Sequence, residues 1–167
     1  APFVPFIALA VRLDSPGPIV YRQVRTERFG RTFVLPKFRT MVENAEDETG
    51  AVIMDDERDP RITRVGDFLR KSYLDELPQL VSILRGEMSA VGPRPERPEL
   101  DDQWTDDVAA WPRRWYVKPG LTGFAQVDFE GFDEGRYAEE NLDADDRYMH
   151  EWSLWLDCKL VGKQFGK

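Results

Sequence analysis

Two adjacent carboxylates, Asp75 and Glu76, stand where an apolar helical pattern begins. Neighbouring residues of a helix point about 100° apart, so these two cannot face each other across a bond as the carboxyl pair of a glycosidase does. We therefore expect different tasks for them. One could attack phosphorus as a nucleophile, and the other could bind a metal or accept a proton. A purely structural interpretation stays open, because acidic residues are favoured at helix N-termini by the macrodipole.

Several basic side chains could bind phosphate near these acids. Lys37 and Arg39 are two residues apart in a predicted strand, so both should project from one face and could hold a diphosphate. Arg94 lies between two prolines that stiffen its backbone, and a guanidinium binds phosphate oxygens as a fork. Arg70 could act similarly. A solvated strand face, a surface turn or a helix-end charge would explain these cations equally well.

The helix expected to carry the two acids has a defined start and end. Pro78 is tolerated only if this helix begins near Asp75, and Gly86 suits its end. A capping box from Ser72 to Asp75 would start it one turn earlier. Spacings of i, i+3, i+4 and i+7 predict one apolar face, formed by Leu77, Leu80, Val81 and Leu84.

The remaining elements predict a small, mostly helical α+β fold. Residues 19–25 and 32–39 read as the two strands of a hairpin, and Pro36 places the second strand at an edge. A further short strand is expected at 124–127. Helical segments are expected at 41–48, 62–69, 104–115 and 132–157.

Length, charge and residue usage argue against several classes of function. A chain of 167 residues, 41% hydrophobic, supports one domain with a real core. The net charge of −8 arises entirely in residues 99–167, with 16 acids against 8 bases, so nucleic-acid binding is disfavoured. A single cysteine, Cys158, cannot form an internal disulfide and fits a reducing compartment. With one histidine, His150, a zinc site or a Ser-His mechanism is not expected.

The first eleven residues are largely apolar and admit two interpretations. As a helix they would span about 16 Å, roughly half of a bilayer's hydrocarbon core. They could be a buried end of the domain, or half of a longer membrane element. The aromatic run 152–156 could likewise be core or an interfacial belt. Together with Phe3 and Phe6 it would suit one membrane-facing side.

Taken in order, these motifs resemble those of a known family, and the resemblance extends over nearly the whole chain. The chain resembles the catalytic domain of the monotopic polyprenyl-phosphate phosphoglycosyl transferases, the bacterial sugar transferase family. Each matching stretch is weak alone, but the ordered set is specific. The stretches are 14–18 (DSPGP), 21–23 (YRQ), 37–41 (KFRTM), 75–80 (DELPQL), 86–89 (GEMS), 91–95 (VGPRP), 118–123 (KPGLTG), 125–127 (AQV) and 152–157 (WSLWLD).

The resemblance implies an enzyme and a reaction. A sugar-1-phosphate passes from a UDP-sugar to a membrane polyprenyl phosphate such as undecaprenyl phosphate, and UMP is released. This is the first membrane step of glycoconjugate assembly. Asp75 then becomes the nucleophile that forms a covalent phosphosugar intermediate, and Glu76 the Mg²⁺ ligand. Arg94 is the first choice for a phosphate contact, followed by Lys37 and Arg39.

The resemblance also implies a place at the cytoplasmic face of the bacterial inner membrane. Family members carry a re-entrant membrane helix broken at a Ser-Pro-type pair, which Ala1-Pro2 resembles. Residues 1–13 would be its returning half, with Phe3, Phe6 and Ile7 in contact with lipid. Residues 14–167 would form the catalytic domain.

Some questions stay open at the level of sequence. The segment 129–135 replaces the family's usual Asn-Gly turn, which leaves the identity of the sugar undecided. A homo-oligomer is compatible with the sequence. The main alternative function is a non-catalytic membrane-peripheral interaction domain that keeps the fold. A soluble aspartyl-phosphate phosphatase is a third alternative, but the Asp75-Glu76 pair is not part of the Asp-x-Asp motif that it would need.

Overall fold

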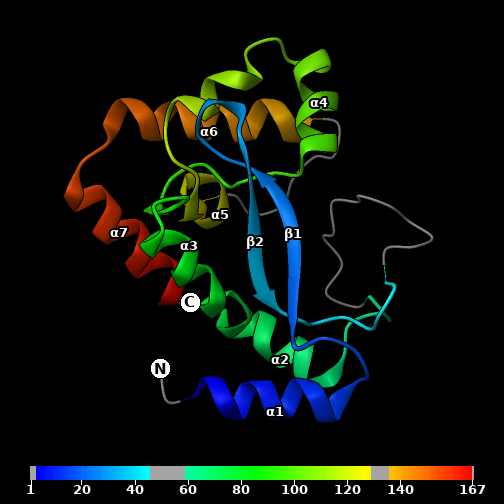
Figure 1. The fold of residues 1–167 in the computed structure, drawn as a ribbon. Coiled ribbons are helices and arrows are strands. Elements are labelled where there is room, and N and C mark those ends of the chain that lie inside the picture. The colour runs from blue at the N-terminus through cyan, green and yellow to red at the C-terminus, as the bar shows by residue number, and fades with distance from the viewer. Residues whose placement is uncertain (1–2, 46–58, 129–135, 167) are drawn as a thin grey trace. The chain divides into compact units, whose positions relative to one another are not determined.

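The computed structural model describes residues 3–45, 59–128 and 136–166, and it contains helices and short strands (Figure 1). The contacts divide the chain into two compact units. The first unit comprises Ala1–Gln23 and Leu35–Val81, and the second comprises Val24–Val34 and Ser82–Lys167. The predicted mixture of helix and strand is confirmed. The predicted division at residues 13 and 14 stays a prediction.

The predicted hairpin is confirmed. Strands β1 (Val20–Thr26) and β2 (Thr32–Phe38) form a two-stranded sheet, joined by a 3₁₀ turn at Arg28–Gly30. The turn reverses the chain through two residues with positive φ, Phe29 and Gly30. Since each strand of a two-stranded sheet is an edge, Pro36 can lack a donor without breaking a central ladder.

The core of the first unit forms where helix α1 (Val4–Asp14) packs on helix α2 (Arg64–Lys71) (Figure 1). The buried apolar residues of this core are Ile7, Val11, Phe38 and Leu69. The prediction that Ile7 faces lipid is therefore wrong, because its side chain is 8% exposed. The α2 N-terminus is capped twice, since Thr63 Oγ1 accepts from Gly66 N and Asp14 Oδ2 accepts from Val65 N.

The helix predicted to start at Asp75 is split in the structure. Residues Leu74–Gln79 form a 3₁₀ helix (η2), and a short α-helix, α3 (Leu80–Leu84), follows it. Pro78 lies inside η2 and lacks the N–H that a regular α-helix would use. The capping box is not formed, because Ser72 ends α2 and its Oγ donates to the Phe68 carbonyl.

The apolar face predicted for this segment is mostly not buried. Leu80, Val81 and Leu84 are all exposed, Leu84 by 88%. Only Leu77 packs against a core, that of the first unit. The apolar spacing therefore correctly indicated helical structure but not burial.

A parallel strand pair organises the second unit. Strand β3 (Ser89–Val91) pairs with β4 (Gly120–Thr122), with Ser89 opposite Gly120. A Cβ on Gly120 would overlap the Gly92 backbone, so glycine is required for this close approach. The predicted strand at 124–127 is wrong, since those residues form helix α5 (Phe124–Asp128).

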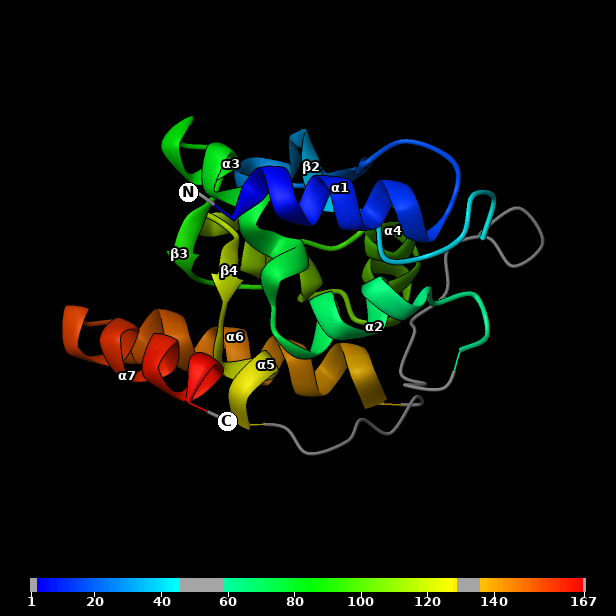
Figure 2. The ribbon, with the colours of Figure 1, turned by 90° about the horizontal axis from the view of Figure 1, so that it is seen from below.

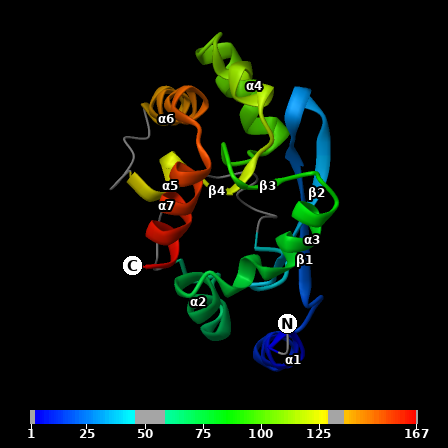
Figure 3. The same ribbon diagram turned by 90° about the vertical axis from the view of Figure 1, so that its left-hand side faces the viewer.

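Three helices pack together beside this strand pair. Helix α5 contacts α6 (Tyr137–Glu151) and α7 (Leu154–Phe165), and α7 also contacts β3 and β4 (Figures 2 and 3). The single helix expected over 132–157 is thus interrupted at Trp152. Trp152, Leu154 and Trp155 are exposed by 63–78%, so the core interpretation of this aromatic run is wrong for them.

Two other helical predictions differ in their bounds. The segment expected at 104–115 forms helix α4 (Pro98–Asp107) and a 3₁₀ helix, η3 (Trp111–Tyr116). Their core is built on Trp104, Trp111 and Tyr137. The helix expected at 41–48 is not seen in its described part, because Met41 bridges Ile62 and a turn follows. The remainder of that prediction, 46–48, lies outside the described residues.

Candidate active site

Asp75 is one of two buried residues of η2 and is 7% exposed. Burial disfavours its charged form and raises the pKa of its carboxyl above the ordinary value. The positive charges of Lys37 and Arg70 act in the opposite direction, and the Glu76 charge adds to the rise. Asp75 is thus a poorly solvated carboxylate flanked by two cations, a suitable state for a nucleophile.

Glu76 has a different environment from its neighbour. Its Oε1 lies 2.8 Å from Lys37 Nζ, and the two side chains are 18% and 22% exposed. The structure therefore brings Lys37, Asp75 and Glu76 together in the first unit. Their separate environments agree with the different tasks that helix geometry predicts for the two acids.

Arg70 belongs to the same group of charges. It lies in the last turn of α2, and its Nε donates to Thr40 Oγ1 at 3.2 Å. The side chain is partly buried and close enough to Asp75 to lower the pKa of that carboxyl. Arg70 is thus well placed to contribute positive charge to a phosphate bound at Asp75.

Arg39 serves the backbone of the first unit. It lies just past the end of β2 and is 6% exposed. Its guanidinium donates to the carbonyls of Ser15 at 2.7 Å and of Pro18 at 2.6 Å. The alternative of a solvated strand face does not hold for Arg39, whose side chain is buried and fixes the α1–β1 connection. Its predicted contact with phosphate stays a prediction.

Gln79 is a buried residue of η2 that the sequence analysis does not single out. It is the second buried residue of η2, 2% exposed, and its Nε2 has no acceptor among the described residues. A buried amide donor without a partner is costly and is rare in proteins. The only signal in the sequence is its place in the DELPQL motif, since a glutamine in a helix is otherwise unremarkable.

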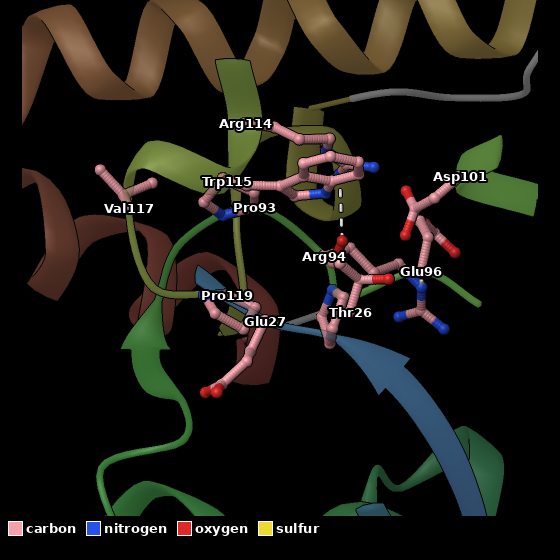
Figure 4. Close-up of a pocket in the computed structure, with 11 residues that line it drawn as sticks. Thr26, Glu27, Pro93, Arg94, Glu96, Asp101, Arg114, Trp115, Val117 and Pro119 are labelled. Atoms are coloured by element: carbon pink, nitrogen blue, oxygen red, sulfur yellow. Dashed lines mark hydrogen bonds and ion pairs between the residues drawn. The ribbon is translucent and has the colours of Figure 1, made fainter. Parts of the chain in front are cut away.

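Arg94 lies in the second unit, on the segment between β3 and α4. Its side chain is 36% exposed, and its Nε lies 4.0 Å from Glu96 Oε1. Both residues line a small cavity whose wall also includes Arg114, Asp101 and Trp115 (Figure 4). The two prolines that flank Arg94 restrict its backbone, as the sequence predicts, and its side chain is partly accessible to solvent.

The carboxylates at Asp75 and Glu76 fit a Mg²⁺ ion that also takes ligands from the phosphates of a substrate. No group of three His, Cys, Asp or Glu side chains that could enclose a metal occurs among the described residues. Mg²⁺ commonly uses only one or two carboxylates and completes its coordination with water and phosphate oxygens. Two adjacent carboxylates, of which Glu76 is the more accessible, meet that requirement.

Two sequence predictions lie outside the described residues. These are the helix break at Ala1-Pro2 and the sugar-pocket segment 129–135.

Comparison with known proteins gives one consistent result. A family model described as bacterial sugar transferase matches residues 1–167. The UDP-glucose:undecaprenyl-phosphate glucose-1-phosphate transferase of Escherichia coli (strain K12) is 42% identical over 165 residues, covering 96% of this chain and 35% of that protein. A protein of the same name from Caulobacter vibrioides (strain ATCC 19089 / CIP 103742 / CB 15) is 40% identical, covering 96% of this chain and 60% of its own length.

A relative named for another sugar is similar to nearly the same extent. The UDP-N-acetylgalactosamine-undecaprenyl-phosphate N-acetylgalactosaminephosphotransferase of Aeromonas hydrophila is 37% identical, covering 98% of this chain and 38% of that protein. The chain thus spans from about a third to three fifths of the length of these three relatives.

Proposed function

The chain belongs to the bacterial sugar transferase family, and from this membership we propose that it transfers a sugar-1-phosphate from a UDP-sugar to undecaprenyl phosphate. The names of relatives supply the two substrate classes. They differ in the sugar, glucose in one and N-acetylgalactosamine in another, so the proposal leaves the sugar open. The observation that carries the chemistry is a buried Asp75 carboxylate beside Lys37 and Arg70.

In the proposed first step, a carboxylate oxygen of Asp75 attacks the phosphorus bound to the sugar. An Asp75 O–P bond forms, the bond between that phosphorus and the bridging oxygen of the diphosphate breaks, and UMP leaves with the bridging oxygen and its electron pair. In the second step, an oxygen of undecaprenyl phosphate attacks the same phosphorus, and Asp75 leaves as a carboxylate. Desolvation makes the Asp75 carboxylate a stronger nucleophile than an exposed one.

The basic side chains would bind and orient the diphosphate. Lys37 and Arg70 provide positive charge beside Asp75 in the first unit. Arg94, which belongs to the second unit, is a separate candidate for a phosphate contact because its guanidinium can bind phosphate oxygens as a fork. Glu76 would hold Mg²⁺, which when bound neutralises diphosphate charge. Lys37 also fixes the Glu76 carboxylate through their 2.8 Å contact.

The proposed place at the cytoplasmic face of the inner membrane requires a surface that contacts lipid, and the exposed face of α1 supports that requirement. Phe3, Phe6, Leu9 and Leu13 are each 58–78% exposed. An apolar helix face of this kind suits the interface of a bilayer, where the lipid substrate resides. In the described ranges 3–45, 59–128 and 136–166, every helix is too short or too polar to cross a bilayer.

The test uses the full protein with undecaprenyl phosphate, Mg²⁺ and a panel of UDP-sugars, and it measures UMP release. We expect release with at least one UDP-sugar, and a covalent phosphosugar adduct on Asp75 in intact-mass and peptide mass spectrometry. Asp75→Asn should abolish both signals. Asp67→Asn, an exposed acid on α2, is the matched control and should retain them. An adduct on another residue, or turnover by Asp75→Asn, would contradict the mechanism.

A further inference from the structure

The backbone around Arg94 is held by an unusual number of hydrogen bonds. Four consecutive carbonyls, those of residues 93–96, each accept one from a different donor in the second unit. The donors are Gly120 N to Pro93 O at 2.8 Å, Arg114 Nη2 to Arg94 O at 3.0 Å, Arg25 Nη1 to Pro95 O at 3.0 Å and Thr26 N to Glu96 O at 2.9 Å. With prolines at 93 and 95, carbonyls are the groups by which this segment can be fixed.

Among these donors, Arg114 is itself held by further contacts of its guanidinium. Its Nε and Nη2 lie 2.9 Å and 2.8 Å from Asp145 Oδ2, and both side chains are 2% exposed. The guanidinium also lies over the Trp111 ring, 4.0 Å from its centroid. A planar guanidinium held on two sides has one orientation, so Nη2 donates to the Arg94 carbonyl from a fixed position.

The Arg114 guanidinium is buried in an ion pair with Asp145, whereas the Arg94 side chain is partly exposed to solvent. A buried ion pair costs desolvation free energy, and well-packed apolar residues often give equal stability. Fixing a geometry is then a reason for this pair to be present. The group it fixes is the backbone of Arg94, whose side chain is 36% exposed and lies 4.0 Å from Glu96 Oε1.

We propose that Arg114, locked by Asp145, is a positioning residue that aims Arg94 at the phosphates of the nucleotide sugar. The proposal rests on the proposed function for its substrate. Arg114 does not touch the substrate in this scheme. It acts through the Arg94 carbonyl, so substitution of Arg114 should lower kcat/KM only when Arg94 itself is present to bind phosphate.

The test is a double-mutant cycle in the full protein with UDP-sugar and undecaprenyl phosphate. Arg114→Lys keeps a cation beside Asp145 but loses the fork. We expect it to lower kcat/KM by about tenfold or more, because a small misplacement of a binding group is costly. In an Arg94→Lys background, the same change should cost less than about twofold, since additivity fails for coupled residues. Arg113→Lys, at an adjacent and half-exposed arginine, is the control and should be silent in both backgrounds.

A second readout does not depend on turnover. Hydrogen exchange of the peptide that contains residues 92–97 should become faster in Arg114→Lys and stay unchanged in Arg113→Lys. Equal losses of kcat/KM in both backgrounds, or unchanged exchange, would overturn the proposal. Absence of UMP release by the wild type would instead contradict the proposed function, and the exchange result would still decide the role of Arg114.

A folding defect can be separated from a positioning defect. If Arg114→Lys melts below the assay temperature, the paired substitution of Arg114→Gln with Asp145→Asn replaces it, because removing both charges leaves none buried alone. The same two results are expected of the pair, and the same outcomes would overturn the proposal.

Discussion

Lys37 Nζ lies 2.8 Å from Glu76 Oε1 and so joins strand β2 to the residue that follows Asp75. The same ammonium lowers the pKa of Asp75, against the upward effect of burial. Lys37 thus has two connected effects in the first unit. It fixes the η2 turn to the hairpin, and it favours the ionised form of the proposed nucleophile.

Removing Lys37 should shift the pH dependence of catalysis. In Lys37→Met the pKa of Asp75 loses its largest lowering influence and rises further. The acidic limb of the kcat/KM profile should therefore move to higher pH, and activity at neutral pH should fall. The measurement is a pH–rate profile for UMP release.

Lys71→Met is the matched control for Lys37→Met. Lys71 is 62% exposed and pairs with Asp67 on the outside of α2. Its substitution should leave the acidic limb in place. A shift of equal size in both variants would mean that net charge, not proximity to Asp75, sets the limb.

Asp75→Asn should stabilise the protein while removing its activity. The pKa of Asp75 is higher in the folded state than the ordinary aspartate value of 3.8, so the folded state holds the proton more tightly. Stability from this group is present below pH 3.8 and is lost as pH rises through the raised pKa. The variant should therefore melt higher than wild type at pH 7 but not at pH 3. Asp67→Asn should show no such gain, and a lower melting temperature for Asp75→Asn at pH 7 would contradict the prediction.

The local part of the fold could be predicted from the sequence, whereas its long-range pairings could not. The hairpin follows from two apolar runs around Gly30, all within 20 residues. The pairing of Ser89 with Gly120 depends on backbones far apart in the chain, which local residue patterns do not reveal; these patterns predict a strand at 124–127 instead. Similarly, the spacing from Leu77 to Leu84 predicts a helix but contains no information on whether another element covers it.

In the candidate site, too, some features can be predicted from the sequence and others depend on the fold. The sequence singles out Asp75 and Glu76 because they occur in an ordered set of motifs, and the structure places Lys37 beside them. The sequence predicts the same strand face for Arg39 and Lys37. Only the fold reveals that the Arg39 guanidinium donates to the Ser15 and Pro18 carbonyls. Arg114 stands next to Arg113 in the sequence, and burial alone distinguishes them.

Arg39→Lys tests whether that side chain is structural. Arg39 donates to the Pro18 and Ser15 carbonyls from two separate nitrogens, Nη1 and Nη2, whereas a lysine has a single donor nitrogen, so the free energy of unfolding should fall by about 2–4 kcal/mol. Urea denaturation measures the loss, and KM for the UDP-sugar should change little in the folded protein. Arg31→Lys, in the exposed hairpin turn, should alter neither. A raised KM with unchanged stability would instead support a direct phosphate contact.

Gln79→Met tests the buried amide in η2. Because Gln79 Nε2 has no acceptor among the described residues, its removal should raise the free energy of unfolding by about 1 kcal/mol. If the amide serves the bound substrate, turnover should fall at the same time. Thermal melting and UMP release measure the two effects. Reduced stability would show that the amide is satisfied in solution, and full turnover would exclude a catalytic contribution.

Adjacent residues of α1 should separate membrane binding from folding. Phe6 is 72% exposed and Ile7 is 8% exposed, so one faces outward and the other packs in the core. Phe6→Glu should weaken binding to anionic liposomes, measured by co-sedimentation, without changing the melting temperature. Ile7→Ala should cost about 2–5 kcal/mol of stability by leaving a cavity. Phe29→Glu, at an exposed phenylalanine in the hairpin turn, is the control and should leave binding unchanged. Equal binding by Phe6→Glu and wild type would mean that the α1 face is not the membrane contact, and the exposed Trp152 and Trp155 would be the next residues to substitute.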